Sequence, residues 1–406
     1  MTRLGVWQWD GFHVADIEDR RGTVFLRYTD DARSRWIESS PVVSCSLPVS
    51  QKWRDATGFL RGVLPEGRHL ERMAADAGLA VTDTSGLLRR YGRDVAGALV
   101  IADEWPGDRP GHAVPYDESS LADEVASMED RSLGLYDDSE LSIAGIQNKL
   151  LLIAQDAGGW ARPAGGAPST HILKADHTRH PGLIEAEVAC MRLARHLGLT
   201  SVDASLETIA GVDCLIVSRF DRVRHEDGRV GRIHQEDICQ ALGGDPSDAK
   251  GRAKYEDSGG PSLRAVARLL DAHAADPLVE MDSLVAAMTF TVLVGNADAH
   301  GKNLAFLHEG ASIRLAPLYD VVPTVLWPSL RTAPAMSIGP RVTTIDKVTT
   351  DDILAEARMW PHEVGRTLPI VHDVANRAAD AVDRGSVEHR GLADLVVANA
   401  RRLLGE

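Results

Sequence analysis

Three polar side chains between residues 295 and 320 have the types and the spacing that metal-assisted phosphoryl transfer needs. This stretch reads GNADAHGKNLAFLHEGASIRLAPLYD; it contains Asp298, then Asn303 five positions later, and it ends at Asp320. In such a site one aspartate orients a substrate hydroxyl, an asparagine at this spacing holds a metal ion, and a later aspartate holds the metal against nucleotide phosphates. The alternative interpretation is an ordinary turn whose polar groups bond to one another, because Asn, Asp and Gly also dominate such turns.

The elements around this stretch determine whether the three side chains can meet. Helices are predicted over residues 262–273 and 278–294, so that Asp298 follows the end of an apolar helix. Residues 304–308 and 313–318 are predicted as two strands that turn at Glu309 and Gly310. That hairpin would return Asp320 to the side of Asn303.

A segment of small residues, SIAGIQNK, lies at residues 142–149, directly before an apolar strand at 150–154. Small residues at Ser142, Ala144 and Gly145 allow backbone N–H groups to approach a phosphate closely. The segment has neither the GxGxxG nor the GxxxxGK[ST] pattern, so a plain turn at the start of a strand is the alternative.

A lysine and a glutamate follow in the order that a kinase uses. The strand-like run THILK ends at Lys174, and residues 183–197 have the apolar spacing of an amphipathic helix. A strand lysine that binds the α- and β-phosphates pairs in kinases with a glutamate of the next helix. Glu187 is the predicted partner and Glu185 competes with it.

A second predicted hairpin, residues 205–210 and 214–220, ends at Ser218, Arg219 and Phe220. In a kinase this exit passes between two lobes and offers backbone groups to adenine; Phe220 would line the adenine site or belong to the core. Residues 233–242 are predicted as the start of a helix, with residues 235–237 capping its first turn.

Composition limits the function classes. The chain has 406 residues, a net charge of −15 and 44% hydrophobic residues, which is typical of a globular protein of two or three domains. The acidic balance argues against a broad nucleic-acid surface, since that needs clustered Lys and Arg. The four cysteines lack zinc-site spacing, no secretory signal is visible, and the longest apolar run, residues 283–295, is short of a membrane span, so we expect no membrane contact and a cytoplasmic location.

Four regions are predicted along the chain. Residues 1–102 form an N-terminal α+β subdomain, with strands at 5–9, 22–28 and 97–101, and helices at 57–78 and 85–91, the first of them interrupted at Pro65. Residues 103–140 are a linker and lead-in that is rich in Pro, Gly and Asp at its start. Residues 141–222 form a β-rich lobe, and residues 223–406 form a mainly helical lobe. Residues 321–345 occupy the position of an activation segment.

Several weak signals in the order of a kinase favour the active-site interpretation over the turn. The same residues resemble the HipA-type serine/threonine kinase toxins of bacterial toxin–antitoxin modules over nearly the whole chain. The pieces that carry the resemblance are SIAGIQNK, THILK, AEVACMRLARHLGL, SRFDR, HQEDICQALG, GNADAHGKN and LAPLYD, with LPEGR and YGRDVAGAL in the N-terminal region.

By that resemblance the fold is α+β: a two-lobed protein-kinase-like fold with an extra N-terminal subdomain. It implies that Asp298 is the catalytic residue, that Asn303 and Asp320 are the metal ligands, that Glu187 pairs with Lys174, and that Ser142 is a site of autophosphorylation. The hinge residue Ser218 departs from a well-known member of the family, which has glutamate there. The implied ATP-contacting residues are Ala144, Gly145, Ile146, Gln147, Asn148, Lys149, Lys174, Ser218, Arg219, Phe220, His300, Gly301, Lys302, Asn303, Tyr319 and Asp320.

The resemblance also implies the cofactors and partners. These are ATP with Mg²⁺, a protein substrate such as an aminoacyl-tRNA synthetase, and a HipB-like helix-turn-helix antitoxin that brings operator DNA. Two alternatives stay open: a small-molecule kinase on the same lobes, and an antitoxin-binding corepressor with little kinase activity.

Overall fold

The computed structural model describes residues 3–107, 111–128, 149–176, 180–245, 253–340 and 343–406. The chain divides into two compact units. The first unit contains residues 1–175, 208–253 and 307–312, and the second contains residues 176–207, 254–306 and 313–406. The predicted catalytic and metal-binding residues all belong to the second unit.

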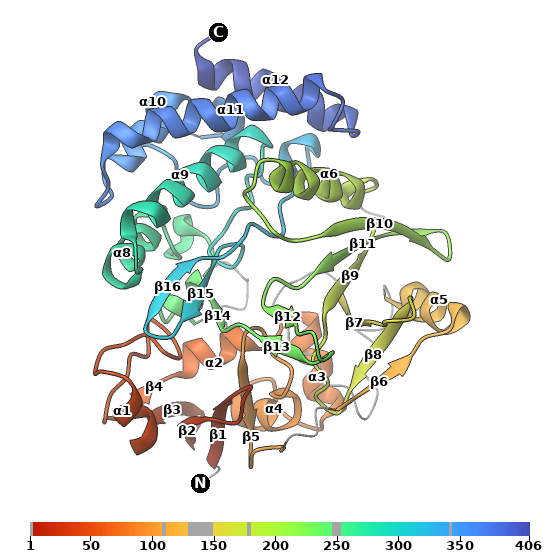
Figure 1. Ribbon diagram of the computed structural model, residues 1–406, viewed down its shortest axis with the longest axis vertical. Helices are drawn as coiled ribbons and strands as arrows, with labels where there is room; N and C mark the ends of the chain where they lie inside the picture. The colour runs from red at the N-terminus through yellow and green to blue at the C-terminus, as the bar shows by residue number, and fades with distance from the viewer. Residues whose placement is uncertain (1–2, 108–110, 129–148, 177–179, 246–252, 341–342) are drawn as a thin grey trace. The chain divides into compact units, whose positions relative to one another are not determined.

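An antiparallel five-stranded sheet with the order β4-β3-β2-β1-β5 begins the first unit (Figure 1). Helix α2 ends at Val63, before Pro65, and the chain restarts as α3, so the predicted break is confirmed. Strand β2 was not predicted. The elements of this region are β1 (Arg3–Gln8), β2 (His13–Arg20), β3 (Thr23–Tyr28), α1 (Asp30–Arg35), β4 (Arg54–Asp55), α2 (Thr57–Val63), α3 (Arg68–Asp76), α4 (Thr84–Tyr91) and β5 (Leu99–Ala102).

A six-stranded sheet with the order β10-β11-β9-β7-β8-β6 follows. The region predicted as a linker contains regular secondary structure. Its residues 112–115 form β6, which pairs with β8, and residues 118–127 form a capped helix. The elements are β6 (His112–Pro115), α5 (Glu118–Ser127), β7 (Lys149–Ala154), β8 (Trp160–Ala164), β9 (His171–Ala175), β10 (Ala204–Ile209) and β11 (Val212–Ser218).

The prediction of one helix over residues 233–242 is partly wrong. Residues Gln235–Asp237 form strand β14, and only Ile238–Ala241 are helical, as α7. Asp237 caps that helix as expected, but Glu236 is buried and accepts a hydrogen bond from His308 at 3.1 Å. The remaining strands are β12 (Arg222–Arg224), β13 (Val230–Arg232), β15 (Ala305–Glu309) and β16 (Ser312–Leu315).

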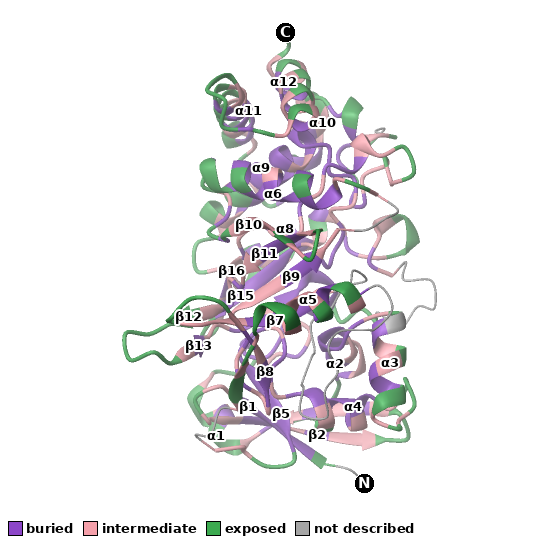
Figure 2. Cartoon of the chain, turned by 90° about the vertical axis from the view of Figure 1, so that its right-hand side faces the viewer, coloured by how far each residue is buried: buried purple, intermediate pink, exposed green. Residues whose placement is uncertain are grey.

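Helix α9 (Pro277–Leu293) is the centre of the second unit. Its N-terminus is stabilised because Asp276 caps it and Pro277 occupies its first turn. The helix packs against four other helices. Figure 2 shows buried residues concentrated along α9, with exposed residues on the outer helices. The other helices of this unit are α6 (Leu183–His196), α8 (Leu263–His273), α10 (Thr350–Ala357), α11 (Thr367–Asp383) and α12 (Arg390–Leu404).

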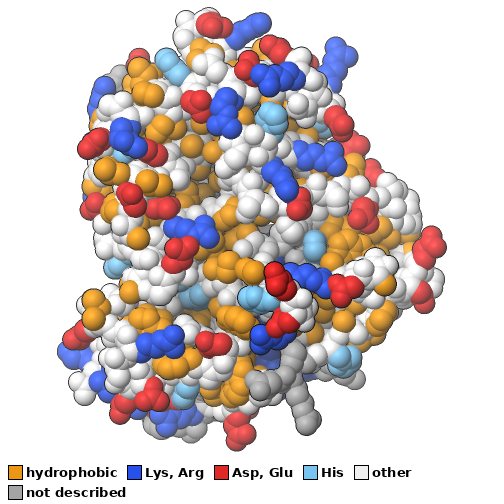
Figure 3. Space-filling model, viewed as in Figure 1, with side chains coloured by type: hydrophobic (Ala, Val, Ile, Leu, Met, Phe, Trp, Pro, Cys, Tyr) orange, Lys and Arg blue, Asp and Glu red, His pale blue; other side chains and the backbone are white. Residues whose placement is uncertain are grey.

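Acidic and basic side chains intermingle on the face that Figure 3 presents, as expected for a chain with a moderate acidic excess. Within the described residues, none of the helices combines the length and the apolar character that crossing a membrane requires.

A buried cluster of ions ties the N-terminal subdomain to the exit of β11 within the first unit. Asp94 accepts from Arg222 at 2.9 Å and lies 3.6 Å from a nitrogen of Arg232, while Arg219 donates to Asp221 at 2.7 Å. Burial alone would raise the pKa of Asp94, but the surrounding guanidinium groups outweigh it and hold that pKa below its ordinary value. Burial lowers the pKa of Arg222 to about 10.

We expect Asp94→Asn to destabilise the fold by roughly 3–5 kcal/mol, because it leaves buried guanidinium groups without their counter-charge. The folded-state pKa of Asp94 is depressed, so its stabilisation is complete at neutral pH and decreases only below about pH 4. Urea unfolding of both proteins at pH 7 measures the difference.

The matched control is Asp227→Asn, which breaks an Asp–Arg pair of 2.7 Å whose side chains are 50% and 75% exposed. An exposed pair contributes little to stability, because water already solvates both charges. Equal losses of stability in the two variants would contradict the role of burial.

Candidate active site

The site begins where α9 ends. Val294 caps the helix, and Gly295 turns the chain with φ +67°, a conformation that glycine adopts without strain. A Cβ at Gly295 would lie 2.5 Å from Cγ2 of Val325 and 3.0 Å from Cδ2 of Leu395. The turn therefore depends on glycine for its backbone angle and for its packing.

Asp298 and Asn303 lie on one tight loop, as predicted. The Asn303 side chain donates to the backbone oxygen of Asp298 at 3.1 Å, and its backbone N–H donates to His300 at 2.8 Å. Asn296, which is buried, accepts from the N–H of Asp298 at 3.1 Å. The loop lacks the repeating backbone hydrogen bonds of a helix or a sheet, so these individual bonds fix where its side chains point.

Three other segments of the second unit hold the loop. The Ala297 N–H donates to the hydroxyl of Thr324 at 2.9 Å, and its carbonyl accepts from Ala335 at 2.9 Å. The Gly301 N–H donates to the carbonyl of Lys254 at 3.1 Å. The loop is thus hydrogen-bonded to residues before and after it in the chain.

Asp320 returns to this loop, as the predicted hairpin requires. Ala316 donates to Ala305 at 2.9 Å just beyond the paired strands, and the Tyr319 hydroxyl donates to the carbonyl of Lys302 at 2.8 Å. Asp320 has φ +57°, a left-handed conformation that is uncommon for residues other than glycine. Such a backbone persists where the surroundings impose it, often at functional sites.

The carboxyl of Asp298 lies within the electrostatic influence of Asp320. Burial raises the pKa of Asp298, and the charge of Asp320 raises it further. A hydrogen bond from the Tyr255 hydroxyl, 2.8 Å from Oδ1, and the charges of Lys254 and Arg331 act in the opposite direction. The net pKa is above the ordinary value.

His300 is neutral in this site. Burial and the charge of Lys254 lower its pKa to about 3. Its Nδ1 accepts from the N–H of Lys302 at 3.3 Å, which places the ring proton on Nε2. Lys302 is itself buried, so this loop contributes a cation and a neutral donor beside the carboxylates.

Asn303 and Asp320 fit a magnesium ion in the manner of an open site. Among the described residues no three His, Cys, Asp or Glu side chains gather to form a closed metal site. Mg²⁺ needs fewer protein ligands than that, because it keeps waters and binds nucleotide phosphates through one or two carboxylates. Asn303 and Asp320 supply the oxygen ligands that such an ion prefers.

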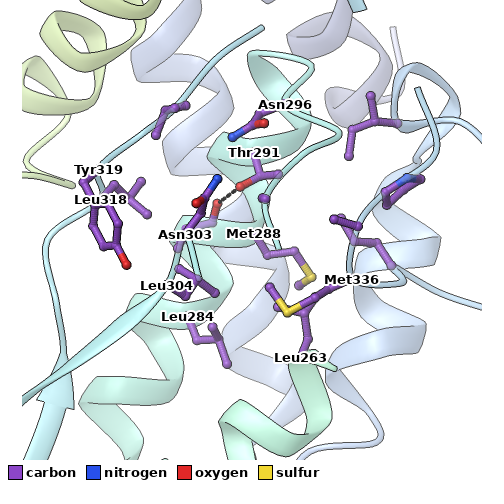
Figure 4. Close-up of a pocket in the computed structure, with 17 residues that line it drawn as sticks. Leu263, Leu284, Met288, Thr291, Asn296, Asn303, Leu304, Leu318, Tyr319 and Met336 are labelled. Carbon is purple, nitrogen blue, oxygen red and sulfur yellow. Dashed lines mark hydrogen bonds between the residues drawn. The ribbon is translucent and has the colours of Figure 1, made fainter. Parts of the chain in front are cut away.

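A small apolar cavity lies behind the loop in the second unit (Figure 4). Asn303 and Tyr319 are at one edge, and Met288 and Met336 lie on the other side. Most of the side chains that line the cavity are apolar, and Asn303 and Tyr319 belong to both the cavity and the loop region.

The remaining predicted residues lie in other parts of the chain. Lys174 is buried on β9, and Lys149 stands opposite it on β7. Glu187 is buried on α6 whereas Glu185 is exposed, which favours Glu187 as the helix glutamate. Lys174 belongs to the first unit and Glu187 to the second, so their pairing stays a prediction.

The predicted hinge is in the first unit. Ser218 and Phe220 are half-buried, and the Arg219 side chain is buried in the ion cluster, where it also donates to Ser169 at 2.7 Å. The backbone of Arg219 is bonded as well: its N–H donates to the carbonyl of Thr170 at 2.9 Å, and its carbonyl accepts from the N–H of Arg222 at 3.3 Å. The predicted phosphate-loop and autophosphorylation residues outside the described part of the chain are Ser142, Ala144, Gly145, Ile146, Gln147 and Asn148.

Sequence reasoning missed Tyr255, Lys254 and Arg331. They are up to 44 positions from Asp298, and their segments have no motif of a known site. Arg331 lies with its Cζ 4.8 Å from the centre of the Tyr255 ring. Only the folded chain brings these residues to the loop.

Comparison with known proteins identifies relatives of the chain. The HipA N-terminal domain matches residues 4–102 and the HipA-like C-terminal domain matches residues 141–383. The putative kinase Y4mE of Sinorhizobium fredii is 36% identical over 401 residues, covering 94% of this chain and 91% of that protein. The serine/threonine-protein kinase toxin HipA of Shewanella oneidensis is 31% identical over 340 residues, covering 78% and 73%.

A solved structure shares the fold. HipA of Shewanella oneidensis, in its complex with HipB and operator DNA, matches with a TM-score of 0.82 at 24% identity, covering 99% of this chain and 97% of that chain. The match confirms the predicted fold class, a HipA-like kinase fold with an added N-terminal α+β subdomain.

We expect Gly295→Ala to destabilise the second unit by roughly 1–3 kcal/mol more than left-handed strain alone, because the new methyl group overpacks against Val325 and Leu395. Thermal unfolding of the purified protein measures the loss.

Gly385→Ala is the control, since Gly385 of the same unit has φ +74° and open space around its Cβ position. It isolates the cost of the backbone angle. If the two variants melt together, packing at Gly295 does not secure the loop.

Proposed function

The chain belongs to the HipA family of kinase toxins, and on that premise we propose that it is itself an ATP-dependent serine/threonine protein kinase and the toxin of a toxin–antitoxin module. The observation that supports this most is the approach of Asp320 to the Asp298–Asn303 loop. A family member that had lost its kinase activity would have no need to keep two mutually repelling carboxylates in one site.

Asp298 is the proposed catalytic residue. Tyr255 binds its Oδ1, and Oδ2 accepts a hydrogen bond from the substrate Ser or Thr hydroxyl. The hydroxyl oxygen forms the bond to the γ-phosphorus, the bond to the β,γ-bridging oxygen breaks, and the hydroxyl proton passes to Asp298. Orientation and electrostatic stabilisation account for most of the rate in such transfers.

Asn303 and Asp320 would hold Mg²⁺, which neutralises charge on the nucleotide phosphates when it is bound. His300, Gly301, Lys302 and Tyr319 complete the proposed nucleotide-contacting loop of the second unit. The buried cation of Lys302 and the Nε2–H of His300 suit phosphate oxygens.

Residues of the first unit would complete ATP binding. Lys174 would neutralise the α- and β-phosphates, with Glu187 as its ion-pair partner, and Lys149 directly opposite adds a second cation. Residues 144–149 would form the phosphate loop. Ser218, Arg219 and Phe220 would form the hinge beside adenine, where the Arg219 side chain serves the ion cluster.

The substrate and the partner are proposed at the level of the family. The expected substrate is a translation protein such as an aminoacyl-tRNA synthetase, and the expected site of action is the cytoplasm. The related HipA was solved with HipB and operator DNA, which supports a HipB-like helix-turn-helix antitoxin here. An acidic chain suits a partner that carries the basic DNA-reading surface.

We expect Asp298→Asn to lower phosphate transfer by about 10²–10⁴-fold while the fold persists, because the acceptor hydroxyl loses its oriented proton acceptor. The measurement uses γ-labelled ATP, Mg²⁺, the full chain and a bacterial lysate, resolved into protein bands and small-molecule products. Asp380→Asn, at an exposed pair on α11, is the control and should keep the wild-type rate.

A labelled protein band supports the protein kinase, whereas a labelled small product supports the small-molecule alternative. Transfer by Asp298→Asn at the wild-type rate would remove Asp298 from the mechanism. A wild-type chain that binds antitoxin but labels nothing would favour the corepressor.

Autophosphorylation gives a separate expectation. After incubation with ATP and Mg²⁺, mass spectrometry should find phosphate on Ser142 in the wild-type chain and none in Asp298→Asn, since the same residue would orient the acceptor. Phosphate on Ser142 in both proteins would indicate another enzyme as its source.

A further inference from the structure

The segment of residues 254–257 lies between the catalytic loop and residues 331–337. On the loop side, the carbonyl of Lys254 accepts from Gly301 at 3.1 Å, and the Tyr255 hydroxyl donates to Oδ1 of Asp298 at 2.8 Å. The Tyr255 ring meets the His300 ring edge-on, with centroids 5.3 Å apart. Two successive residues of this segment thus contact the loop.

The opposite side of the same segment is bonded to residues after Asp320. Glu256 donates its N–H to Ala335 at 3.0 Å, and its carboxylate accepts from the N–H of Ser337 at 2.6 Å. Asp257 accepts from Arg331 at 2.8 Å. The segment is therefore held from both sides.

Arg331 fixes the ring of Tyr255. Its guanidinium lies over that ring, with Cζ 4.8 Å from the centroid, and it donates to the carbonyl of Ala333 at 2.6 Å. A cation placed over a tyrosine face is attracted by the ring electrons. With His300 at one edge and Arg331 over the face, the ring has little freedom to move its hydroxyl away from Asp298.

The hydrogen bond from Tyr255 gives the two oxygens of the catalytic carboxylate different roles. A hydroxyl donor on Oδ1 stabilises one rotamer of Asp298 and leaves Oδ2 for the substrate hydroxyl. A carboxylate without that donor would rotate between orientations, of which only some accept the substrate proton.

We propose that Tyr255 is a positioning residue that acts through Asp298: it holds the carboxylate in the orientation in which the second oxygen receives the acceptor hydroxyl. This inference rests on the proposed kinase function. Arg331 supports it by holding the ring, so that residues 331–337 contribute to the geometry of the catalytic aspartate.

The decisive experiment is a double-mutant cycle in the full-length protein. Tyr255→Phe should lower kcat for phosphate transfer roughly 10- to 100-fold, the loss expected for one hydrogen bond to a charged group, with the KM for ATP unchanged. In the Asp298→Asn background the same change should cost less than about twofold, because a residue acting through Asp298 has nothing left to position. Additive losses would overturn the proposal.

Two further variants separate the hydrogen bond from the ring. Replacement of Tyr255 by p-aminophenylalanine retains a donor and should recover most of kcat, while O-methyltyrosine retains the oxygen without the donor and should not. Tyr319→Phe is the matched control, since that hydroxyl binds the carbonyl of Lys302, and its loss should add to that of Asp298→Asn. Equal activity of the amino and O-methyl variants would contradict positioning by a donor.

The failure of this inference can be told apart from the failure of the proposed function. Hydrogen exchange of residues 295–303 should increase in Tyr255→Phe, and in Arg331→Met as a second variant, without any assay of catalysis. A wild-type chain that transfers no phosphate but shows this increase would reject the kinase and retain the contact. Active chains with unchanged kcat and unchanged exchange would reject the role of Tyr255.

Discussion

The charge of Asp320 opposes the ionisation of Asp298, and the second unit holds the two carboxylates together against that repulsion. Three features hold them there. Gly295 lets α9 end in a close turn, Asn303 closes the loop with a hydrogen bond, and Asp320 adopts a left-handed backbone conformation. Each costs some backbone freedom or strain, which the packed helices around α9 offset. A bound cation would relieve part of this repulsion, which supports the proposal that the site takes a nucleotide with its magnesium ion.

The loop that carries Asp298 has no regular secondary structure, so its geometry is set by its neighbours. Residues 254–257 bond to it from one side and residues 331–337 bond to them in turn. Residues 331–337 belong to the region where a kinase has its activation segment. The polar bonds between these three segments connect that region physically to the loop of Asp298, the proposed catalytic residue.

Local patterns predicted the elements that carry the site, and tertiary contacts supplied what the patterns could not. Alternation and turn residues were enough for the β15–β16 hairpin, and Pro65 for the break between α2 and α3. Glu236 was assigned to a helix start because its burial depends on His308, which lies 72 positions further along the chain on strand β15. Tyr255 had no signal at all: a lone tyrosine becomes part of the site only when the chain returns to the loop. Sequence order did predict that Asp320 returns to the loop of Asp298 and Asn303, while the roles of these three residues stay predictions.

A buried ion cluster explains why the N-terminal subdomain and the predicted hinge belong to the same unit. Arg219 and Arg222 both follow the end of β11 at Ser218, and two buried guanidinium groups so close together would be unstable alone. Asp94 of the N-terminal subdomain, with Asp221, supplies the charge that balances them, and the carbonyl of Val95 accepts from both arginines. These bonds fix the chain where it leaves β11, at the predicted hinge. The geometry of the predicted hinge therefore depends on the contacts that Asp94 and Val95 of the N-terminal subdomain supply.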